Sequence, residues 1–314
     1  MGEKNIYAIG IDLGGTFVKA ALVSENGEII FKDKLPIGFS ASKNTILDTI
    51  EKIIKMVLVK AESEQITVDG IGMGTPGIVQ NGVILGGSEN LDGWENIDLS
   101  GYYSKIFNLP VLVDNDANLM GLGEFYFGAA KDCTDVVFLT IGTGIGGAVI
   151  IDGALYGGYE NRGTELGHVV VEHNGPDCNC GGKGCLEIYA STTALIKDYS
   201  LRSGKAIKDL DGHYIIKKFK ENEENAVLCL NDHTNYLGHG IASFINTFSP
   251  QKVVIGGGIS DAGQFYIDLI SKYAFGYMMP SCGHNTKVVG AQLGNNAGSL
   301  GAAALILKKD TQNN

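Results

Sequence analysis

The chain has 314 residues, enough for one large domain or two medium domains with a substantial core. Its formal net charge of −11 argues against a nucleic-acid-binding protein, which needs clustered lysine and arginine side chains. No apolar run approaches the length of a membrane span and no apolar signal region follows the first residues, so we expect a cytoplasmic protein without membrane contact.

The first motif follows a short apolar strand at residues 6–11 and precedes a second strand. Its two glycines let backbone N–H groups approach phosphate oxygens, and its acid can hold Mg²⁺ directly or through water. A plain hairpin turn is the alternative. Because a strand and not a helix follows, a P-loop or a Rossmann fingerprint is disfavoured. The motif resembles the first phosphate loop of the actin-like ATPase superfamily, and we assign to it Asp12, Gly14, Gly15, Thr16 and Lys19.

An amphipathic helix begins after Ser42, which is placed to cap it, and its apolar residues recur at helical spacing up to Leu58. A strand at residues 68–73 then ends in the turn Gly74-Thr75-Pro76-Gly77. The loop Asn90-Leu91-Asp92-Gly93-Trp94 follows, and the alternative to a role in substrate contact is a plain turn and a core tryptophan.

A strand at residues 111–113 ends in Asp114-Asn115-Asp116-Ala117-Asn118, and a helix follows. A carboxylate at the tip of a strand and the start of a helix is either a helix cap or a functional group. The sequence alone leaves both possibilities open for Asp116.

The strand at residues 136–141 leads to a glycine turn, and a return strand ends near Ile151. This repeats the strand, glycine turn, strand plan of the first motif, so it predicts an internal duplication with a second phosphate loop. The residues assigned to that loop are Gly142, Thr143 and Gly144.

The stretch from Glu165 to Glu187 contains three thiols and an imidazole, separated by glycines and an asparagine. Thiolate and neutral imidazole are preferred ligands of Zn²⁺. A disulfide fits poorly because Cys-x-Cys is too short for a comfortable bridge between its own members. We therefore predict a structural zinc site, with His173 as the alternative imidazole. Its ligands are His168, Cys178, Cys180 and Cys185.

The same stretch resembles the signature of the ROK family, which contains sugar kinases, glucokinases among them, and sugar-responsive repressors. The matching pattern is Gly167-His168, a gap, and Cys-x-Cys-Gly-x-x-x-Cys-x-Glu. The resemblance implies that His168 both binds zinc and touches the sugar, and that Glu165 and Glu187 hold sugar hydroxyls. Zinc would then fix the sugar-binding loop and take no part in catalysis, because four protein ligands leave no open position for water.

The resemblance also gives roles to the earlier motifs. It implies that Asp116 is the general base and Asn115 a sugar-hydroxyl donor, with Gly77 and Asn90 bordering the sugar. A sugar 6-hydroxyl is a poor nucleophile until a carboxylate takes its proton, and such help contributes on the order of 10²–10⁴ in rate.

Helices are expected at residues 188–199 and 237–248, with short helices between 205 and 225. The turn after the strand at residues 252–255 resembles the family's loop on the adenosine side, although such turns are routine in α/β domains. Its glycines are Gly256, Gly257 and Gly258. Residues 291–307, rich in glycine and alanine, predict a closing helix that packs back on the N-terminal domain.

For the fold, the resemblance implies an α/β protein of the actin-like ATPase (ribonuclease H-like) type, duplicated into two domains with central mixed sheets and an interdomain cleft. We place the N-terminal α/β domain at residues 1–117, closed by a C-terminal helix at 298–314. The larger C-terminal domain, with the zinc loop, is placed at 118–297.

The motifs together predict an ATP- and Mg²⁺-dependent hexose kinase, with glucose as the expected substrate and N-acetylmannosamine or N-acetylglucosamine as alternatives. Asn161-Arg162-Gly163-Thr164 bears on that choice, since many family members carry small residues there. A sugar-responsive repressor is disfavoured because the first phosphate loop begins at Asp12, leaving no room for a helix-turn-helix domain. The family resemblance further implies a homodimer or homotetramer.

Overall fold

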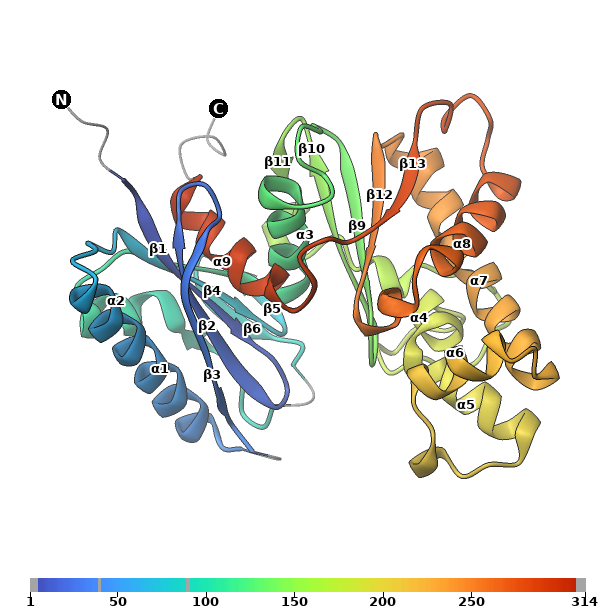
Figure 1. Ribbon diagram of the computed structural model, residues 1–314, viewed down its shortest axis with the longest axis horizontal. Coiled ribbons are helices and arrows are strands. Elements are labelled where there is room, and N and C mark those ends of the chain that lie inside the picture. Colours follow the sequence, from blue (N-terminus) through green and yellow to red (C-terminus); the bar gives the residue numbers. More distant parts are fainter. Residues whose placement is uncertain (1–4, 39–40, 89–90, 309–314) are drawn as a thin grey trace. The chain divides into compact units, whose positions relative to one another are not determined.

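The computed structural model describes residues 5–38, 41–88 and 91–308. The chain divides into two compact units (Figure 1). The predicted boundary after residue 117 falls inside helix α3 (Asp116–Phe127), which packs on α9 (Ala297–Leu307) within the first unit. The first unit comprises Met1–Asp132, Gly153–Thr164 and Asn295–Asn314, and the second comprises Cys133–Asp152 and Glu165–Gly294.

The first unit is built on a five-stranded sheet of order β3-β2-β1-β4-β8. The strands β1, β2 and β3 are antiparallel, whereas β4 and β8 run parallel to β1. The carboxyl ends of the three parallel strands therefore lie at one edge, where the first glycine turn and Asp116 follow. The strands are β1 (Tyr7–Leu13), β2 (Phe17–Ser24), β3 (Ile29–Pro36), β4 (Gly70–Thr75) and β8 (Val111–Asn115).

Helix α1 (Lys43–Ser63) covers one face of this sheet (Figure 1). The predicted cap is confirmed, because Ser42 accepts a hydrogen bond from the backbone N–H of Thr45. The apolar stripe packs on the sheet through fully buried isoleucines, each contributing about 2 kcal/mol by removal from water. These are Ile46, Ile50, Ile53 and Ile54.

Helix α9 lies against the opposite face of the sheet. Its close packing requires glycines, which have no side chain, in the strands. Gly10 of β1 and Gly72 of β4 are register partners that face the helix. A Cβ atom at Gly10 would lie 1.8 Å from the carbonyl oxygen of Ser299, and one at Gly72 would lie 1.7 Å from that of Ala302. The predicted closing helix is therefore present, although it begins at Ala297. Its backbone is in close contact with the backbone of the two strands.

A small sheet and one helix complete the first unit. Trp94 is buried there, and its indole N–H donates to the Thr75 hydroxyl over 2.8 Å, so this tryptophan is a core residue of the unit. The elements are β5 (Ile78–Gln80), β6 (Val83–Gly86), β7 (Ile97–Asp98) and α2 (Leu99–Phe107).

The second five-stranded sheet, of order β11-β10-β9-β12-β13, repeats the plan of the first. Its β9 and β10 are antiparallel, and β12 and β13 run parallel to β9. The duplication predicted from the two glycine turns is thus present in the sheets. The strands are β9 (Val136–Ile141), β10 (Ile145–Ile151), β11 (Ala154–Leu155), β12 (Lys252–Gly256) and β13 (Lys287–Gly290).

The helices of the second unit differ from two predictions. The helix expected at 188–199 is interrupted at Ser191, which adopts an extended backbone and caps the second half through the N–H of Ala194. The helix expected at 237–248 begins thirteen residues earlier, at Glu224, because one face of its first half, which includes Leu230, His233 and Thr234, is buried. The helices are α4 (Leu186–Ala190), α5 (Thr192–Ser203), α6 (Gly212–Lys220), α7 (Glu224–Phe248) and α8 (Gln264–Tyr277).

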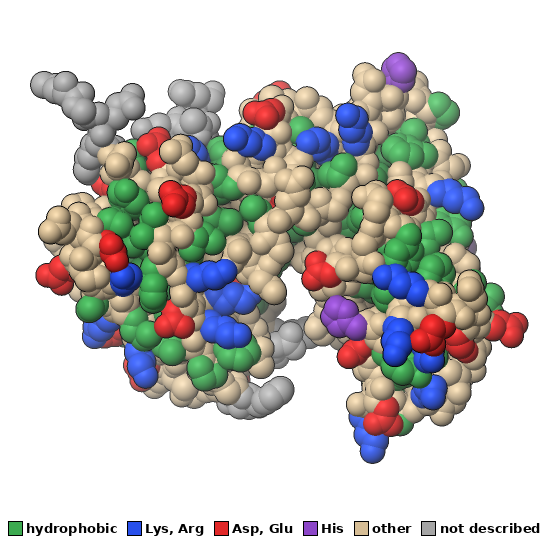
Figure 2. Space-filling view, viewed as in Figure 1, with side chains coloured by type: hydrophobic (Ala, Val, Ile, Leu, Met, Phe, Trp, Pro, Cys, Tyr) green, Lys and Arg blue, Asp and Glu red, His purple; other side chains and the backbone are tan. Residues whose placement is uncertain are grey.

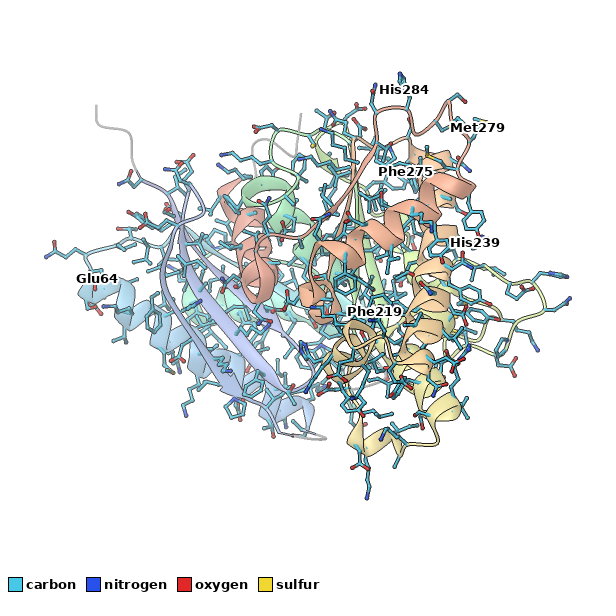
Figure 3. All side chains as sticks on the ribbon, turned by 45° about the vertical axis from the view of Figure 1, so that its right-hand side comes forward. Glu64, Phe219, His239, Phe275, Met279 and His284 are labelled. Carbon is cyan, nitrogen blue, oxygen red and sulfur yellow. The ribbon has the colours of Figure 1, made fainter. Side chains whose placement is uncertain are left out.

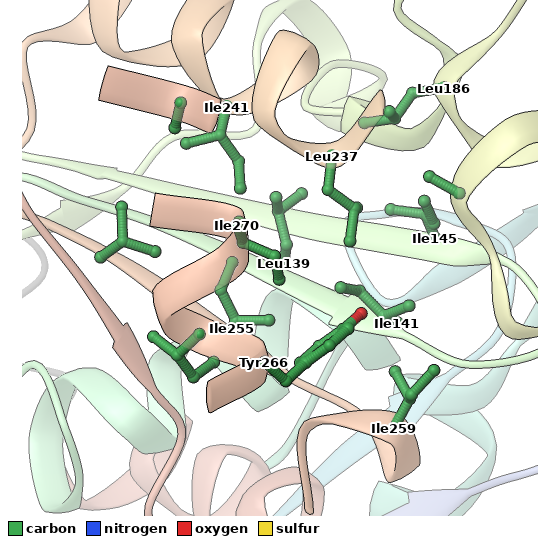
Figure 4. Packing of buried hydrophobic residues seen from close by; sticks show 14 of the residues in the cluster. Leu139, Ile141, Ile145, Leu186, Leu237, Ile241, Ile255, Ile259, Tyr266 and Ile270 are labelled. Atoms are coloured by element: carbon green, nitrogen blue, oxygen red, sulfur yellow. The ribbon is translucent and has the colours of Figure 1, made fainter. Parts of the chain in front are cut away.

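Helices α7 and α8 pack on the sheet of the second unit (Figure 4). Tyr266 is fully buried there and its hydroxyl lies 2.7 Å from Nε2 of His233. Burial lowers the pKa of His233 to about 3, so this histidine is a neutral core residue. His239 lies on the outer side of the same helices (Figure 3). It stacks on Tyr277 with ring centroids 3.8 Å apart.

No helix in the part of the chain that the structure describes combines the length and apolar character needed to cross a membrane.

Candidate functional site

The four predicted zinc ligands converge in the second unit. Their ligand atoms all lie within 4.8 Å of one another. The Cys180 and Cys185 sulfurs are 3.7 Å apart, and Cys178 Sγ lies 3.7 Å from Nδ1 of His168. Tetrahedral Zn–S bonds of about 2.3 Å place two sulfurs about 3.8 Å apart, whereas a disulfide holds them at about 2.05 Å. The donor set and its spacing therefore fit Zn²⁺.

Backbone turns bring these ligands together. The N–H of Cys178 donates to the carbonyl of Gly182 over 2.8 Å, and Gly184, at a φ of +66°, lies so close to Glu172 that a Cβ would be 1.7 Å from its carbonyl oxygen. Burial raises the pKa of the Cys185 thiol to about 12, so a cation is needed to hold this sulfur as a thiolate.

The alternative imidazole lies outside the cluster. The side chain of His173 is 84% exposed, with Nδ1 3.6 Å from a carboxylate oxygen of Glu172 and Nε2 2.8 Å from the amide nitrogen of Asn174. The geometry therefore selects His168 as the imidazole ligand.

Glu187 connects the stretch from Glu165 to Glu187, which we call the zinc segment, to the second glycine loop. Its Oε2 accepts a hydrogen bond of 2.8 Å from the backbone N–H of Ile145, the first residue of β10. A Cβ atom at Gly144 would lie 2.3 Å from the same carboxylate oxygen. Glycine at position 144 therefore leaves the space that the Glu187 carboxylate occupies.

Glu165 begins the short turn that ends at His168, whose backbone N–H donates to the Glu165 carbonyl over 3.0 Å. The turn is held on β10, because Leu166 is buried in the core and a Cβ at Gly167 would lie 2.1 Å from the Ile145 carbonyl oxygen. Glu165 itself is exposed. Both acids and the imidazole are thus fixed to the first residues of one strand.

The second glycine loop, at Gly142, and the loop at residues 256–258 border a common cavity of about 250 Å³ in the second unit. Thr192, the first residue of α5, donates its backbone N–H to the Gly142 carbonyl, yet its buried hydroxyl has no hydrogen-bond partner among the described residues. An unpaired buried hydroxyl costs free energy, so Thr192 is a candidate to bind a polar group in this cavity. The lining includes Gly142, Thr143, Thr192, Thr193, His213, Gly258 and Ile259.

In the first unit, Asp12 and Lys19 are register partners on β1 and β2, and Nζ of Lys19 lies 3.0 Å from Oδ2 of Asp12. Asp12 is buried, and a Cβ at Gly298 in the first turn of α9 would lie 2.6 Å from its carboxyl carbon. The carboxylate therefore rests on the N-terminal turn of a helix, where negative charge is favoured. A Cβ atom added at Gly15 would meet no atom of the described structure within 4 Å beyond its chain neighbours, so there is open space on that side of the loop.

Asn115 and Asp116 join β8 to α3. Asn115 is the helix cap: its Oδ1 accepts from the N–H groups of Ala117 and Asn118, while its Nδ2 donates to the Gly77 carbonyl over 3.0 Å. Asp116 is the first helical residue, half-buried, and its Oδ1 accepts from the N–H of Ala117 over 2.9 Å. The cap considered for Asp116 thus belongs to Asn115, whose amide is largely committed to the backbone.

Asp114 links this strand end to the segment that departs from the family pattern. Its Oδ1 accepts from the amides of Asn118 at 3.0 Å and Asn161 at 3.1 Å, and Asn161 also donates to the Val79 carbonyl at 2.9 Å. Burial raises the pKa of Asp114, although these hydrogen bonds oppose the shift. Asn161 has a positive φ of 56°, so a strained turn brings its amide to β5 and β8.

Of the two remaining candidates, Gly77 has a φ of +98° and accepts from Asn115. Asn90 lies outside the described residues.

The family model described as the ROK family matches residues 8–309. The chain belongs to the ROK family.

Three relatives place the chain within this family. The glucokinase of Thermotoga maritima is 36% identical over 314 residues, covering 96% of this chain and 97% of that protein. A xylose repressor of Bacillus spizizenii is 30% identical over 306 residues, covering 98% of this chain and 78% of the repressor. The crystal structure of a ROK glucokinase from Streptomyces griseus with glucose and AMPPNP matches with a TM-score of 0.81, 31% identity and coverage of 96% and 99%.

The similarity of ROK structures over nearly the whole chain confirms the predicted fold class, the duplicated α/β fold of the actin-like ATPases. Sequence reasoning missed Thr192, Thr193 and His213, although they line the cavity between two predicted loops. A pair of threonines directly after a capping serine was an available signal, but a threonine pair at a helix start is common for structural reasons alone.

Proposed function

We propose that this ROK protein is a hexose kinase that transfers the γ-phosphoryl group of ATP to the 6-hydroxyl of a hexose, with glucose as the first substrate to expect. The observation that carries the proposal is the anchoring of Glu187 to Ile145, which places the acids and imidazole of the zinc segment beside a glycine loop. The names of the Thermotoga maritima and Streptomyces griseus relatives, and the glucose and AMPPNP of the latter, support this substrate pair.

On the sugar side, we assign Glu165 and Glu187 as acceptors of sugar hydroxyl protons. Nδ1 of His168 faces the cysteines, so Nε2 is the ring atom left for a sugar hydroxyl. Zn²⁺ would be held by His168 and the three cysteines and would supply rigidity to the loop.

On the phosphate side, Asp116 takes the proton of the attacking hydroxyl as the new O–P bond forms. Asp12 is the residue that would hold Mg²⁺, with Lys19 adding positive charge beside it. Bound Mg²⁺ neutralises charge on the terminal phosphates. The open loop at Gly14 and Gly15 supplies backbone N–H donors to the same groups.

The unpaired Thr192 hydroxyl and the cavity around it suit a nucleoside. The cavity offers threonine hydroxyls, an imidazole and apolar walls, which match the sugar hydroxyls and the flat base of adenosine. We assign this cavity to the nucleoside part of ATP, with the loops at Gly142 and Gly256 leading from it.

Asn161 supports the alternative of an N-acetylhexosamine. Its amide donates to Asp114 and so fixes the segment at residues 161–164, which differs from the family pattern, on the end of β8 directly before Asn115. A change of wall at this point alters how much room an acetamido group has. The repressor alternative rests on the xylose repressor relative, which shares the aligned region. Asp12, Asp116 and both glycine loops favour the kinase, because a protein that only binds sugar does not need them.

A coupled ADP-release assay over glucose, mannose, N-acetylmannosamine and N-acetylglucosamine tests the proposal. We expect glucose to give the highest kcat/KM. A higher value for an N-acetylhexosamine would reassign the substrate, and ADP release that no sugar increases would reject a sugar kinase. Sugar binding without turnover would favour the repressor class. The expected homodimer or homotetramer and the cytoplasmic location stay predictions.

A further inference from the structure

A second cavity of the second unit is walled by helix α7 and by α4 and α5, which both pack on α7. Its volume of about 360 Å³ is in the range of small-molecule sites. Of its described lining residues, none is among those assigned to the hexose or to ATP. We call it the histidine cavity, and its lining includes Tyr189, Ala194, Asp198, Arg202, Asp232 and His233.

Helix α7 contributes four polar or aromatic side chains to this cavity. Their spacing is i, i+3, i+4 and i+7, which places them on one face of the helix. They are Cys229, Asp232, His233 and Tyr236. The ring of Tyr236 stacks on that of Tyr189 from α4, with centroids 4.3 Å apart and an interplanar angle of 18°. An aromatic pair therefore forms one part of the wall.

His233 has one ring nitrogen without a partner. The residue is only 2% exposed, and its Nε2 lies 2.7 Å from the hydroxyl of Tyr266. Among the described residues this fully buried hydroxyl has no other acceptor, so we assign its proton to the bond with Nε2 and the ring proton to Nδ1. Nδ1 meets no acceptor in the described structure. A buried donor left in this state costs free energy, and an acceptor within the cavity would remove that cost.

Two carboxylates and one guanidinium group supply the charges of the wall. Nε of Arg202 lies 2.9 Å from Oδ1 of Asp198, and its Nη2 lies 2.7 Å from Oδ2 of Asp232. These contacts join α5 to α7 and hold the three groups in place. Arg202 has five N–H donors and Asp232 has a second oxygen, so both keep hydrogen-bonding capacity for a ligand.

This combination of donors and acceptors matches hydroxyl groups, because a hydroxyl both donates and accepts. An anion would meet Asp198 and Asp232, whereas an ammonium group offers no acceptor to the Nδ1–H of His233. Acidic and basic side chains are also mixed over α5 and α6 on the face of the second unit that Figure 2 shows. A mixed surface favours neither sign of ligand charge.

We propose that the histidine cavity binds a small, neutral polyhydroxy compound, either a hexose or a cyclitol, at a site separate from the zinc segment. One hydroxyl accepts from Nδ1–H of His233, and another donates to Asp232. The C–H face of the ring packs beside Tyr189 and Tyr236.

Water is the competing occupant, because one ordered molecule could accept from Nδ1–H of His233. The volume of the cavity equals that of roughly ten waters at about 30 Å³ each, so a single bridging water leaves most of it unused. Water also gains nothing from the aromatic pair, whereas a sugar or cyclitol ring has apolar C–H groups to place there.

Equilibrium dialysis of radiolabelled glucose and myo-inositol against the full-length, zinc-loaded protein tests the proposal. We expect the wild type to bind one equivalent more of at least one probe than Ala194→Leu, whose larger side chain fills the cavity without removing a polar contact. Lys197→Leu, exposed on the same helix, is the matched control and should keep the wild-type stoichiometry.

Asp232→Ala removes an acceptor and leaves Arg202 paired with Asp198. The Kd of the equivalent that Ala194→Leu removes should rise roughly ten- to a hundredfold, as expected for the loss of a hydrogen bond to a charged group. An unchanged Kd would overturn the proposed recognition.

The two probes distinguish the sources of the ligand. An additional equivalent of glucose makes the occupant a hexose, and an equivalent of myo-inositol makes it a cyclitol. If Ala194→Leu removes no equivalent of either probe, the proposal is overturned and water fills the cavity. Dialysis does not require catalysis, so that result would leave the proposed kinase function intact.

Discussion

The two units share one sheet plan but carry different groups at equivalent places. The first glycine turn lies between the register partners Asp12 and Lys19, an acid and a base. The second lies between the register partners Thr140 and Gly146, which are uncharged. The outer parallel strand of the first unit ends in Asn115, directly before Asp116, whereas that of the second ends in Gly290.

The second unit carries in addition the zinc segment, which precedes α4 in the chain. Glu187 is held beside the glycine turn by its hydrogen bond from Ile145, and the turn that begins at Glu165 is held there by the close packing of Gly167 on β10. The two copies therefore share the same sheet scaffold, and the residues at the strand ends determine the chemistry that each copy can carry out. In our proposal the first copy handles phosphates and the proton, and the second handles sugar and nucleoside.

The largest expected effect comes from removing zinc. Cys180→Ser should lower hexose phosphorylation by about 100-fold or more, because three ligands hold the metal and the acids poorly. Zinc content by elemental analysis and turnover check this. Cys133→Ser, outside the cluster, is the control and should retain both. Full activity in a zinc-free protein would show that the segment keeps its shape without metal.

Gly144→Ala and Gly15→Ala compare the two loops directly. At position 144 the new methyl group meets Glu187, so KM for the sugar should rise by roughly ten- to a hundredfold, equivalent to losing a charged hydrogen bond. At position 15 the methyl group enters open space in the phosphate loop, so KM for ATP should rise and KM for the sugar should hold. Equal effects on KM for both substrates from both variants would contradict the assignment of the phosphates to the first loop and of the sugar to the zinc segment.

Gly298→Ala tests the packing of the Asp12 carboxylate against the first turn of α9. Its methyl group would press on the carboxylate, so the Mg²⁺ concentration for half-maximal rate should rise about fivefold, with KM for the sugar unchanged. Gly276→Ala in α8 meets nothing within 4 Å in the described structure and should leave the Mg²⁺ requirement at its original value. A normal Mg²⁺ requirement in Gly298→Ala would dissociate Asp12 from the metal.

Thr192→Val should have an effect as modest as that of Gly298→Ala. Losing one neutral hydrogen bond to the nucleoside raises KM for ATP roughly two- to tenfold. The melting temperature should hold or rise slightly, because the hydroxyl has no partner among the described residues. An unchanged KM for ATP, measured at saturating sugar, would remove this threonine from the nucleoside cavity.

Local chemistry explains which features the sequence could predict. The convergence of three thiols and an imidazole was predictable because these side chains at this spacing have few other uses, and the strands were predictable because apolar runs end in glycine turns. The start of α7 was not, because His233 and Thr234 look polar in the sequence and become buried only through tertiary packing.

The site was predictable as a set of motifs and less so as a set of contacts. Asn115 could be assigned to the end of a strand, but its bonds to Gly77, Ala117 and Asn118 depend on the meeting of β8 with α3. The same holds for Thr192, whose lack of a partner is a property of the folded chain. Long-range hydrogen bonds leave no periodic trace in the sequence.

The central claim is that Asp116 acts as the base while the zinc segment holds the sugar. Asp116→Asn keeps the acceptor for the Ala117 N–H and removes the base. Turnover should fall by at least about 10²-fold, while calorimetry should give glucose binding within about threefold of the wild type. Asp48→Asn on α1 should change neither. Near-normal turnover of Asp116→Asn with glucose bound would contradict the account.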